Sequence, residues 1–268
     1  PSRSFITGIM PLAMADASGY NVAKDVTHKK KINDVMGLRK EDVTECLEAL
    51  YGDDFSKVGE HLSLLEDRCN SHRMVAGGTP LFNPQLSYGY MEQLADGENP
   101  GSEGLLDSNL QVSHNMFDLL LENAKTPGLM DRLIAGEAIP MPRLQVRFGV
   151  RELLNSMNIE SEEFVLSVML SHGMVTWTED TENRSVVIPN KLVLTQFFDR
   201  LKRQMPEGIE NIVRQLVQRP TPSLWSQLVF LIQESRNVAD GGGHFNEMSL
   251  KATCLTALNC FSRGEWVA

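Results

Sequence analysis

One segment of the chain, residues 148–205, limits the fold more than any other because helical and strand patterns follow each other in it in a fixed order. Residues 150–157 place apolar side chains at helical spacing, which predicts a first helix. Ser161 then stands where an N-cap belongs, and two glutamates follow it, where carboxylates suit the helix dipole. Gly173 is a natural stop for this second helix.

A β-hairpin and a third helix complete this segment. Residues 174–178 and 185–188 are rich in β-formers and are joined by a polar turn, which predicts two paired strands. Asn190 then caps a helix whose apolar side chains share one face up to residue 205. Two helices, a two-stranded wing and a helix are the order of a winged-helix-like unit. A purely structural α+β unit without a ligand explains the same pattern, and the residues alone favour that interpretation.

The rest of the chain has mainly helical periodicity. Apolar residues recur at helical spacing over 41–51, 55–67, 209–217 and 224–232, and Asn83 followed by proline is a cap that starts another helix. The fold class is therefore mostly α: a helical lid plus a winged-helix-like unit with a two-stranded β-hairpin, and a strand remnant at the N-terminus.

The strand remnant comprises the apolar residues that end at Thr7 and Gly8. Because a lone strand is not stable without neighbours to pair with, we expect further strands upstream of Pro1 in a longer parent protein.

Charge and cysteine content narrow the range of partners. The formal net charge is −10 with a pI near 5.1, which argues against broad electrostatic affinity for nucleic acid or an anionic membrane. The four cysteines show no metal-ligand spacing, so we expect reduced thiols and an intracellular protein of the cytoplasm or nucleus. No apolar run approaches the roughly 20 residues that span a bilayer.

No complete catalytic motif occurs in the chain. The sequence contains no GxxxxGK[ST], GxSxG or HExxH pattern, and the glycine run 241–243 does not follow a strand, which favours a hinge over a phosphate cradle. The basic cluster 28–31 is either a solvated loop or a phosphate or localisation signal, and the acidic whole favours the loop. We predict no metal site and no catalytic residue in this chain.

A resemblance to a known family adds to this interpretation. Five short segments resemble, in order and spacing, the AAA-ATPase-like family, whose members are P-loop NTPases often fused to a PD-(D/E)xK nuclease-like domain, as in Crinkler-type effectors. These segments are residues 5–11, 37–43, 81–84, 133–139 and 187–190. The similarity extends from Phe5 to about Leu258, but the family's P-loop, Walker B and nuclease carboxylates have no counterparts here.

The resemblance implies three nucleotide-contacting residues. Thr7 matches the threonine that ends a sensor-type strand, and Gly8 follows it. Asn70 and Arg73 match the Asn and Arg of a motif whose aromatic residues and glycine are absent from this chain. The candidate cofactor-binding residues are thus Thr7, Gly8 and Arg73, with ATP and Mg²⁺ expected only in the full-length parent and no cofactor bound by this chain alone.

The resemblance also implies an organisation in four parts. These are a remnant of an NTPase core (1–31), a helical lid region (32–140), a winged-helix-like unit (141–205) and a helical connector toward a missing C-terminal domain (206–268). The expected function is that of a C-terminal regulatory or lid portion, which couples nucleotide state to a nuclease-like or effector domain and is inactive alone. A secreted Crinkler-type parent would act in the host cell or its nucleus.

The alternative is a stand-alone winged-helix-like module that binds protein or DNA. Residues 161–172 contain no Lys or Arg, whereas a groove-reading helix normally brings cations to phosphates. We therefore expect a protein partner rather than DNA, and no membrane. We also expect Trp177, on the first wing strand, to be buried against the helix 190–205 through Phe197 or Phe198. A DNA-reading wing would instead leave it exposed.

Overall fold

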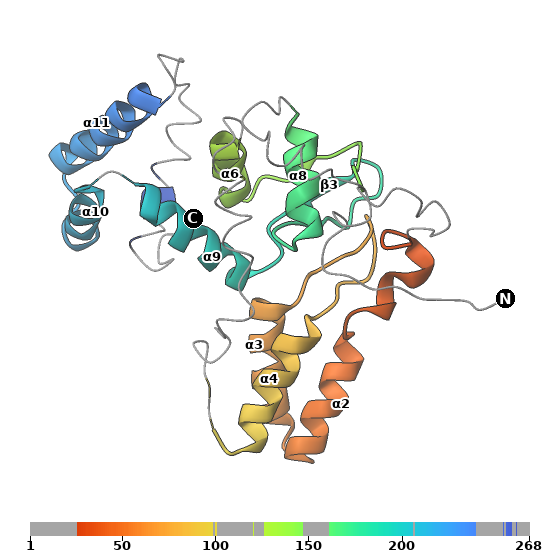
Figure 1. Cartoon of the computed structure of the whole chain (residues 1–268). Coiled ribbons are helices and arrows are strands. Elements are labelled where there is room, and N and C mark those ends of the chain that lie inside the picture. Colours follow the sequence, from red (N-terminus) through yellow and green to blue (C-terminus); the bar gives the residue numbers. More distant parts are fainter. Residues whose placement is uncertain are drawn as a thin grey trace. The chain divides into compact units, whose positions relative to one another are not determined.

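The structure is a computed structural model that describes residues 26–98, 100, 120, 126–146, 161–205, 207–239, 254, 256–258 and 261 (Figure 1). The chain divides into two compact units, Pro1–Thr126 with Ala138–Val193, and Pro127–Glu137 with Leu194–Ala268. The predicted strand remnant with Thr7 and Gly8, the predicted helix at 150–157 and the glycine run 241–243 lie outside the described residues.

The first unit begins with a group of packed helices. A 3₁₀ helix, η1 (Lys30–Val35), precedes three α-helices, α2 (Lys40–Tyr51), α3 (Phe55–Cys69) and α4 (Pro84–Ala95), which lie side by side in Figure 1. Their apolar faces meet in one core, which removes large aliphatic and aromatic side chains from water. Its buried members are Val43, Leu47, Val58, Leu65, Cys69, Phe82, Leu86, Tyr90, Met91, Leu94 and Leu192.

Three predicted helix caps are confirmed by their hydrogen bonds. The side chain of Asn83 accepts hydrogen bonds from the first backbone amides of α4, at 3.0 and 3.2 Å. Ser161 accepts from the Phe164 amide at 3.4 Å, and Asn190 accepts from the Val193 amide at 3.0 Å. These caps satisfy amides that have no partner within the helix.

The first unit also contains a small antiparallel sheet with the order β1-β3-β2. The predicted hairpin is confirmed as β2 (Thr176–Trp177) and β3 (Ser185–Val187), with Thr176 opposite Val187. A strand that the sequence analysis did not predict, β1 (Ile139–Pro140), pairs with the free edge of β3. The sheet is therefore three-stranded rather than two-stranded.

Helix α8 (Glu162–Ser171) precedes the hairpin and is buried around its whole circumference. Six consecutive side chains, Phe164 to Met169, are buried. The chain leaves the helix through Gly173, whose φ of 68° is the left-handed conformation that favours glycine. The side chains of this helix are therefore used mainly for packing.

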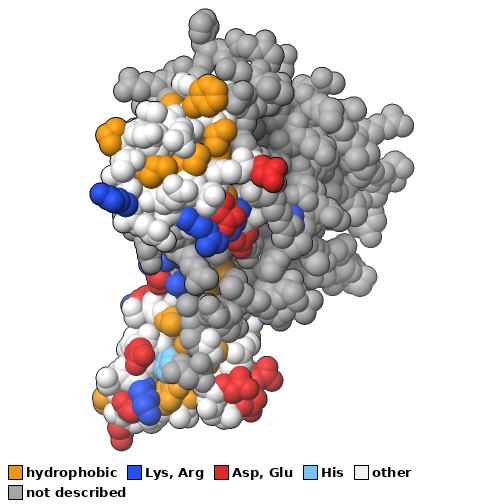
Figure 2. All heavy atoms as spheres, turned by 90° about the vertical axis from the view of Figure 1, so that its left-hand side faces the viewer, with side chains coloured by type: hydrophobic (Ala, Val, Ile, Leu, Met, Phe, Trp, Pro, Cys, Tyr) orange, Lys and Arg blue, Asp and Glu red, His pale blue; other side chains and the backbone are white. Residues whose placement is uncertain are grey.

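The regular elements of the second unit, among the residues that the structure describes, are helices. It contains α6 (Thr126–Ile134), α10 (Ile209–Gln218), α11 (Pro222–Ala239) and most of α9 (Lys191–Gln204), a helix that begins in the first unit. Its core consists of Ile209, Val213, Leu216, Leu228, Ile232, Cys254, Ala257 and Leu258. Val217 and Phe230 are exposed, and Figure 2 shows hydrophobic side chains gathered on the side that carries α10 and α11.

The predicted fold class is confirmed: the chain is mostly α with a small antiparallel sheet. In the part of the chain that the structure describes, no helix combines the length and the apolar character that crossing a membrane requires.

Candidate functional site

The candidate site is the loop of residues 70–82, which leaves α3 and returns to α4. The base of this loop is closed by a hydrogen bond from the Asn83 amide to the Cys69 carbonyl at 3.2 Å. His72 and Leu81 then exchange two backbone hydrogen bonds, at 3.3 and 2.9 Å. The two ends of loop 70–82 are therefore held together by backbone hydrogen bonds.

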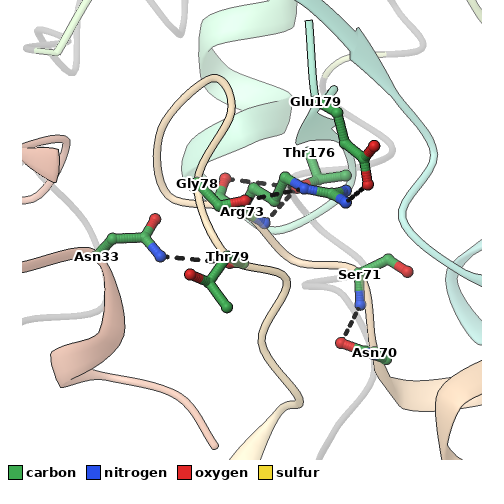
Figure 3. A network of polar contacts seen from close by, with 8 residues as sticks. All are labelled: Asn33, Asn70, Ser71, Arg73, Gly78, Thr79, Thr176 and Glu179. Atoms are coloured by element: carbon green, nitrogen blue, oxygen red, sulfur yellow. Dashed lines mark hydrogen bonds and ion pairs between the residues drawn. The ribbon is translucent and has the colours of Figure 1, made fainter. Parts of the chain in front are cut away.

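Arg73 joins this loop to the hairpin (Figure 3). Its backbone amide donates to Thr176 Oγ1 on β2 at 2.6 Å, and its Nε donates to the Gly78 carbonyl across the loop at 3.1 Å. Its Nη2 pairs at 2.5 Å with Glu179 Oε1 on the turn of the hairpin, residues 179–184, here called the wing turn. The Arg73 side chain is only 11% exposed, whereas that of Glu179 is 85% exposed. The guanidinium thus holds the loop in shape and attaches it to the wing.

Two glycines allow the tip of the loop to pack closely against its neighbours. Gly77 has a φ of 66° and donates to the Thr178 carbonyl at 3.1 Å, and a Cβ there would lie 2.3 Å from Thr181. A Cβ on Gly78 would lie 2.5 Å from Asn33 Oδ1 of η1. Asn33 itself donates to the Thr79 carbonyl at 3.3 Å (Figure 3). The tip is therefore in contact with both η1 and the wing.

The base of the loop is linked to the start of α9. Asn190 Nδ2 donates to the Asn70 carbonyl at 2.9 Å while its Oδ1 caps α9. Next to it, Lys191 Nζ lies 2.8 Å from Asp67 Oδ1 at the end of α3. Since α9 continues into the second unit, the loop contacts the helix that connects the two units.

Of the three residues predicted to contact a nucleotide, the structure describes only one. Thr7 and Gly8 lie outside the described residues. Arg73 lies in the loop with its guanidinium bonded to Gly78 and Glu179, so its nucleotide contact stays a prediction. The sequence analysis missed the partners of Arg73 on the hairpin, which lie more than 100 residues away in the chain. The Gly-Gly pair at the tip was a usable signal for close backbone approach.

Two histidines lie where the loop meets the end of α8. His72 Nε2 donates to the Gly173 carbonyl at 3.3 Å, and His172 Nδ1 donates to the Val168 carbonyl at 2.8 Å. Burial lowers the pKa of both imidazoles below the ordinary value of 6.5, and the carbonyl hydrogen bonds offset this only in part. The loop and the end of α8 thus each carry an imidazole that favours the neutral form.

A third histidine stabilises the core of the three-helix group. His61 on α3 is hydrogen-bonded through Nε2 to the Tyr51 hydroxyl at 3.0 Å and through Nδ1 to the Tyr90 hydroxyl at 2.9 Å. Burial is the leading cause that raises the pKa of Tyr90 to about 12. This Tyr–His–Tyr network joins α2, α3 and α4 and satisfies polar groups that would otherwise be buried without partners.

The wing turn has the wrong charge for phosphate contacts. Residues 179–184 contain three carboxylates and a single cation, Arg184, whose guanidinium carbon lies 5.2 Å from the centre of the Trp177 ring. Asp180 accepts hydrogen bonds from the amide and side chain of Asn183, and these lower its pKa. The turn is thus an acidic surface, and Trp177 is buried as predicted.

A search for a metal-binding cluster and comparisons with known proteins add no further candidate site. Within the described ranges, no group of three or more His, Cys, Asp or Glu side chains is placed to hold a metal ion. No family model, no curated protein and no solved structure matches the chain.

Proposed function

We propose that this chain is a coupling module: the C-terminal lid and winged-helix-like portion of an AAA-ATPase-like P-loop NTPase. In this role it responds to the nucleotide held by an NTPase core and passes that state to a nuclease-like or effector domain. It does not hydrolyse ATP alone, because it lacks the phosphate loop and the metal-binding carboxylate that position the phosphates in such enzymes.

The observation that carries the coupling role is the set of contacts made by loop 70–82. The loop is bonded to η1 through Asn33, to the hairpin through Arg73, and to the cap of α9 through Asn70. A displacement of the helical group therefore reaches the wing and α9 through packed and hydrogen-bonded groups rather than through a flexible linker. The attribution to the AAA-ATPase-like family depends on the sequence resemblance alone.

The second candidate is a stand-alone winged-helix-like module that binds a protein. Two observations weigh against DNA as its ligand. Helix α8 has six consecutive buried side chains and no Lys or Arg, so it offers no cationic face to a groove. The wing turn is acidic and would be repelled by phosphates. A protein surface is the better partner for this module.

The coupling role can be tested on the full-length gene product. ATP hydrolysis and nuclease activity on plasmid DNA would be measured with and without MgATP, for the wild type and for Arg73→Ala. We expect Arg73→Ala to lose the nucleotide dependence of the nuclease activity, and its rate of ATP hydrolysis, measured alongside, tests the predicted nucleotide contact of Arg73. Lys40→Ala is the matched control, since it removes an exposed 2.8 Å ion pair with Glu66 in the same unit without touching the loop.

Three results would contradict the proposal. One is nucleotide-dependent nuclease activity that survives Arg73→Ala unchanged. Another is Mg²⁺-dependent ATP hydrolysis by residues 1–268 that disappears on a point mutation within this chain. The third is a full-length product that neither binds nor hydrolyses ATP.

A further inference from the structure

The histidines His72 and His172 have one feature in common that the coupling role does not explain. Each uses one ring nitrogen to donate to a backbone carbonyl, and the other ring nitrogen is fully buried without a hydrogen-bond partner. The unpartnered atoms are His72 Nδ1 and His172 Nε2. Buried polar atoms normally have partners, so two such atoms at one contact require a physical account.

The hydrogen bonds determine the protonation state of both rings. A carbonyl can only accept, so the bonded nitrogen of each ring carries its proton, and the other nitrogen of a neutral ring carries a lone pair. A second proton would place a charged N–H group in a buried position with no acceptor, which is strongly unfavourable. Both rings are therefore compatible with the docked loop only in the neutral form.

The two histidines lie on either side of one turn: the His72 ring contacts Gly173 from the loop, and His172 precedes Gly173 in the chain. His72 belongs to loop 70–82, and its Nε2 lies 3.5 Å from the position that a Cβ on Gly173 would occupy. His172 is the residue immediately before Gly173 and ends α8. Lifting the loop would break the bond between His72 and Gly173. A latch made of both histidines requires that the same opening expose both rings to water.

We propose that His72 and His172 form an acid-sensitive latch that keeps loop 70–82 docked on the wing while both are neutral and releases it when they take up protons. The latch operates within the first unit and does not depend on the proposed role in an NTPase. Docking begins to weaken at mildly acidic pH, because an exposed imidazole has a pKa near 6.5.

Among the described residues, charged groups on the loop and at the end of α3 next to it are paired with one another. On the loop, Arg73 is bonded to Glu179 of the wing turn, so these two charges largely offset each other at the contact. His28, upstream of η1, contacts the Met74 carbonyl of the loop through Nδ1 at 2.9 Å. On the α3 side, Asp67 faces Lys191 and Arg68. Burial is accordingly the main cause of the lowered pKa of both histidines.

The sign of the effect follows from linkage. Because the pKa is lowered in the docked state, the open state binds more protons, and docking weakens as the pH falls below about 6.5. Between about pH 7.5 and about pH 5.5, one imidazole can shift the opening equilibrium by up to about tenfold and two by up to about a hundredfold.

Amide hydrogen exchange on the intact chain measures this opening directly. The reporting amides are those of Arg73 and Gly77, which donate to Thr176 and to Thr178 when the loop is docked. After correction for intrinsic exchange rates, we expect their protection to fall tenfold to a hundredfold from about pH 7.5 to about pH 5.5. Amides in the middle of α3 serve as the internal reference, and their protection should change far less.

Variants that keep the hydrogen bonds but cannot titrate make the test specific. His72→Gln retains a donor near the Nε2 position, and His172→Asn retains one near the Nδ1 position. The double variant should keep the loop docked at both pH values, and each single variant should lose part of the pH dependence. His28→Asn is the control, because it alters a half-buried histidine that contacts the same loop and should leave the pH dependence unchanged.

The proposal is overturned if wild-type protection at Arg73 and Gly77 does not change with pH, or if it changes equally in the double variant. Should the double variant not fold, the two single variants decide: a pH dependence that is undiminished in both contradicts the latch.

Discussion

Replacing Arg73 tests how the loop is attached to the wing. Arg73→Ala removes two side-chain contacts, the bond from Nε to the Gly78 carbonyl and the ion pair with Glu179, but leaves the backbone bond to Thr176 in place. The first contact joins a largely buried charged donor to a backbone acceptor, and such bonds contribute about 1.5–3 kcal/mol. The second involves a carboxylate that is 85% exposed, so solvent screening limits it to about 1 kcal/mol or less.

The expected costs therefore differ between the two partners of the ion pair. Arg73→Ala should destabilise the first unit by about 2–3 kcal/mol, and Glu179→Gln by less than about 1 kcal/mol. Urea unfolding followed by circular dichroism, with the transitions of the two units fitted separately, would measure both. The double variant completes the cycle and should show a coupling energy of about 1 kcal/mol or less.

Two outcomes would refute this reasoning. If Glu179→Gln costs as much as Arg73→Ala, the exposed ion pair is the main attachment and the Gly78 carbonyl contributes little. If Arg73→Ala changes the free energy of unfolding by less than about 0.5 kcal/mol, within the range of ordinary surface substitutions, the loop does not depend on its arginine.

Three further predictions concern the core of the first unit. Trp177→Ala truncates a buried ring and should cost about 3–5 kcal/mol in urea unfolding, while binding to duplex DNA in a salt titration stays unchanged. A loss of DNA affinity without loss of stability would instead identify a DNA-reading wing. Tyr90→Phe leaves buried His61 Nδ1 without its partner and should cost about 1–3 kcal/mol, whereas a neutral effect would mean that the network is not structural. Burial raises the pKa of the Cys69 thiol to about 12, so iodoacetamide at about pH 8 should label the half-buried Cys46 before Cys69, as mass spectrometry can show. Labelling of Cys69 before Cys46 would contradict the buried position.

Local signals in the sequence predicted the elements of this fold well. Caps such as Asn83 and Asn190 act on amides two or three residues away, so their hydrogen bonds can be inferred from neighbouring residues alone. Helical spacing likewise predicted the buried positions Val43 and Leu47, although Leu50 on the same face is 40% exposed at the end of α2. Helical spacing shows which side chains share one face of a helix. It does not show how far along the helix neighbouring elements cover that face.

The candidate site depends on contacts that no local signal contains. The strand β1 has only two residues, too few for an alternating pattern, so its pairing with β3 could not be predicted. The contacts of Arg73 with Thr176 and Glu179 join segments 103 and 106 residues apart. The resemblance pointed to Arg73 for a different reason, a nucleotide contact, which stays a prediction, whereas the structure shows that its side chain holds the loop.

Hydrogen exchange of loop 70–82 in the full-length gene product, with and without MgATP, tests the central claim most directly. If the chain couples nucleotide state to an effector, MgATP should change the protection of the loop and hairpin amides there, and should leave residues 1–268 alone unaffected. Protection that is identical with and without MgATP in the full-length protein would contradict the coupling role, and a MgATP-dependent change in residues 1–268 alone would contradict the claim that this chain does not bind nucleotide by itself.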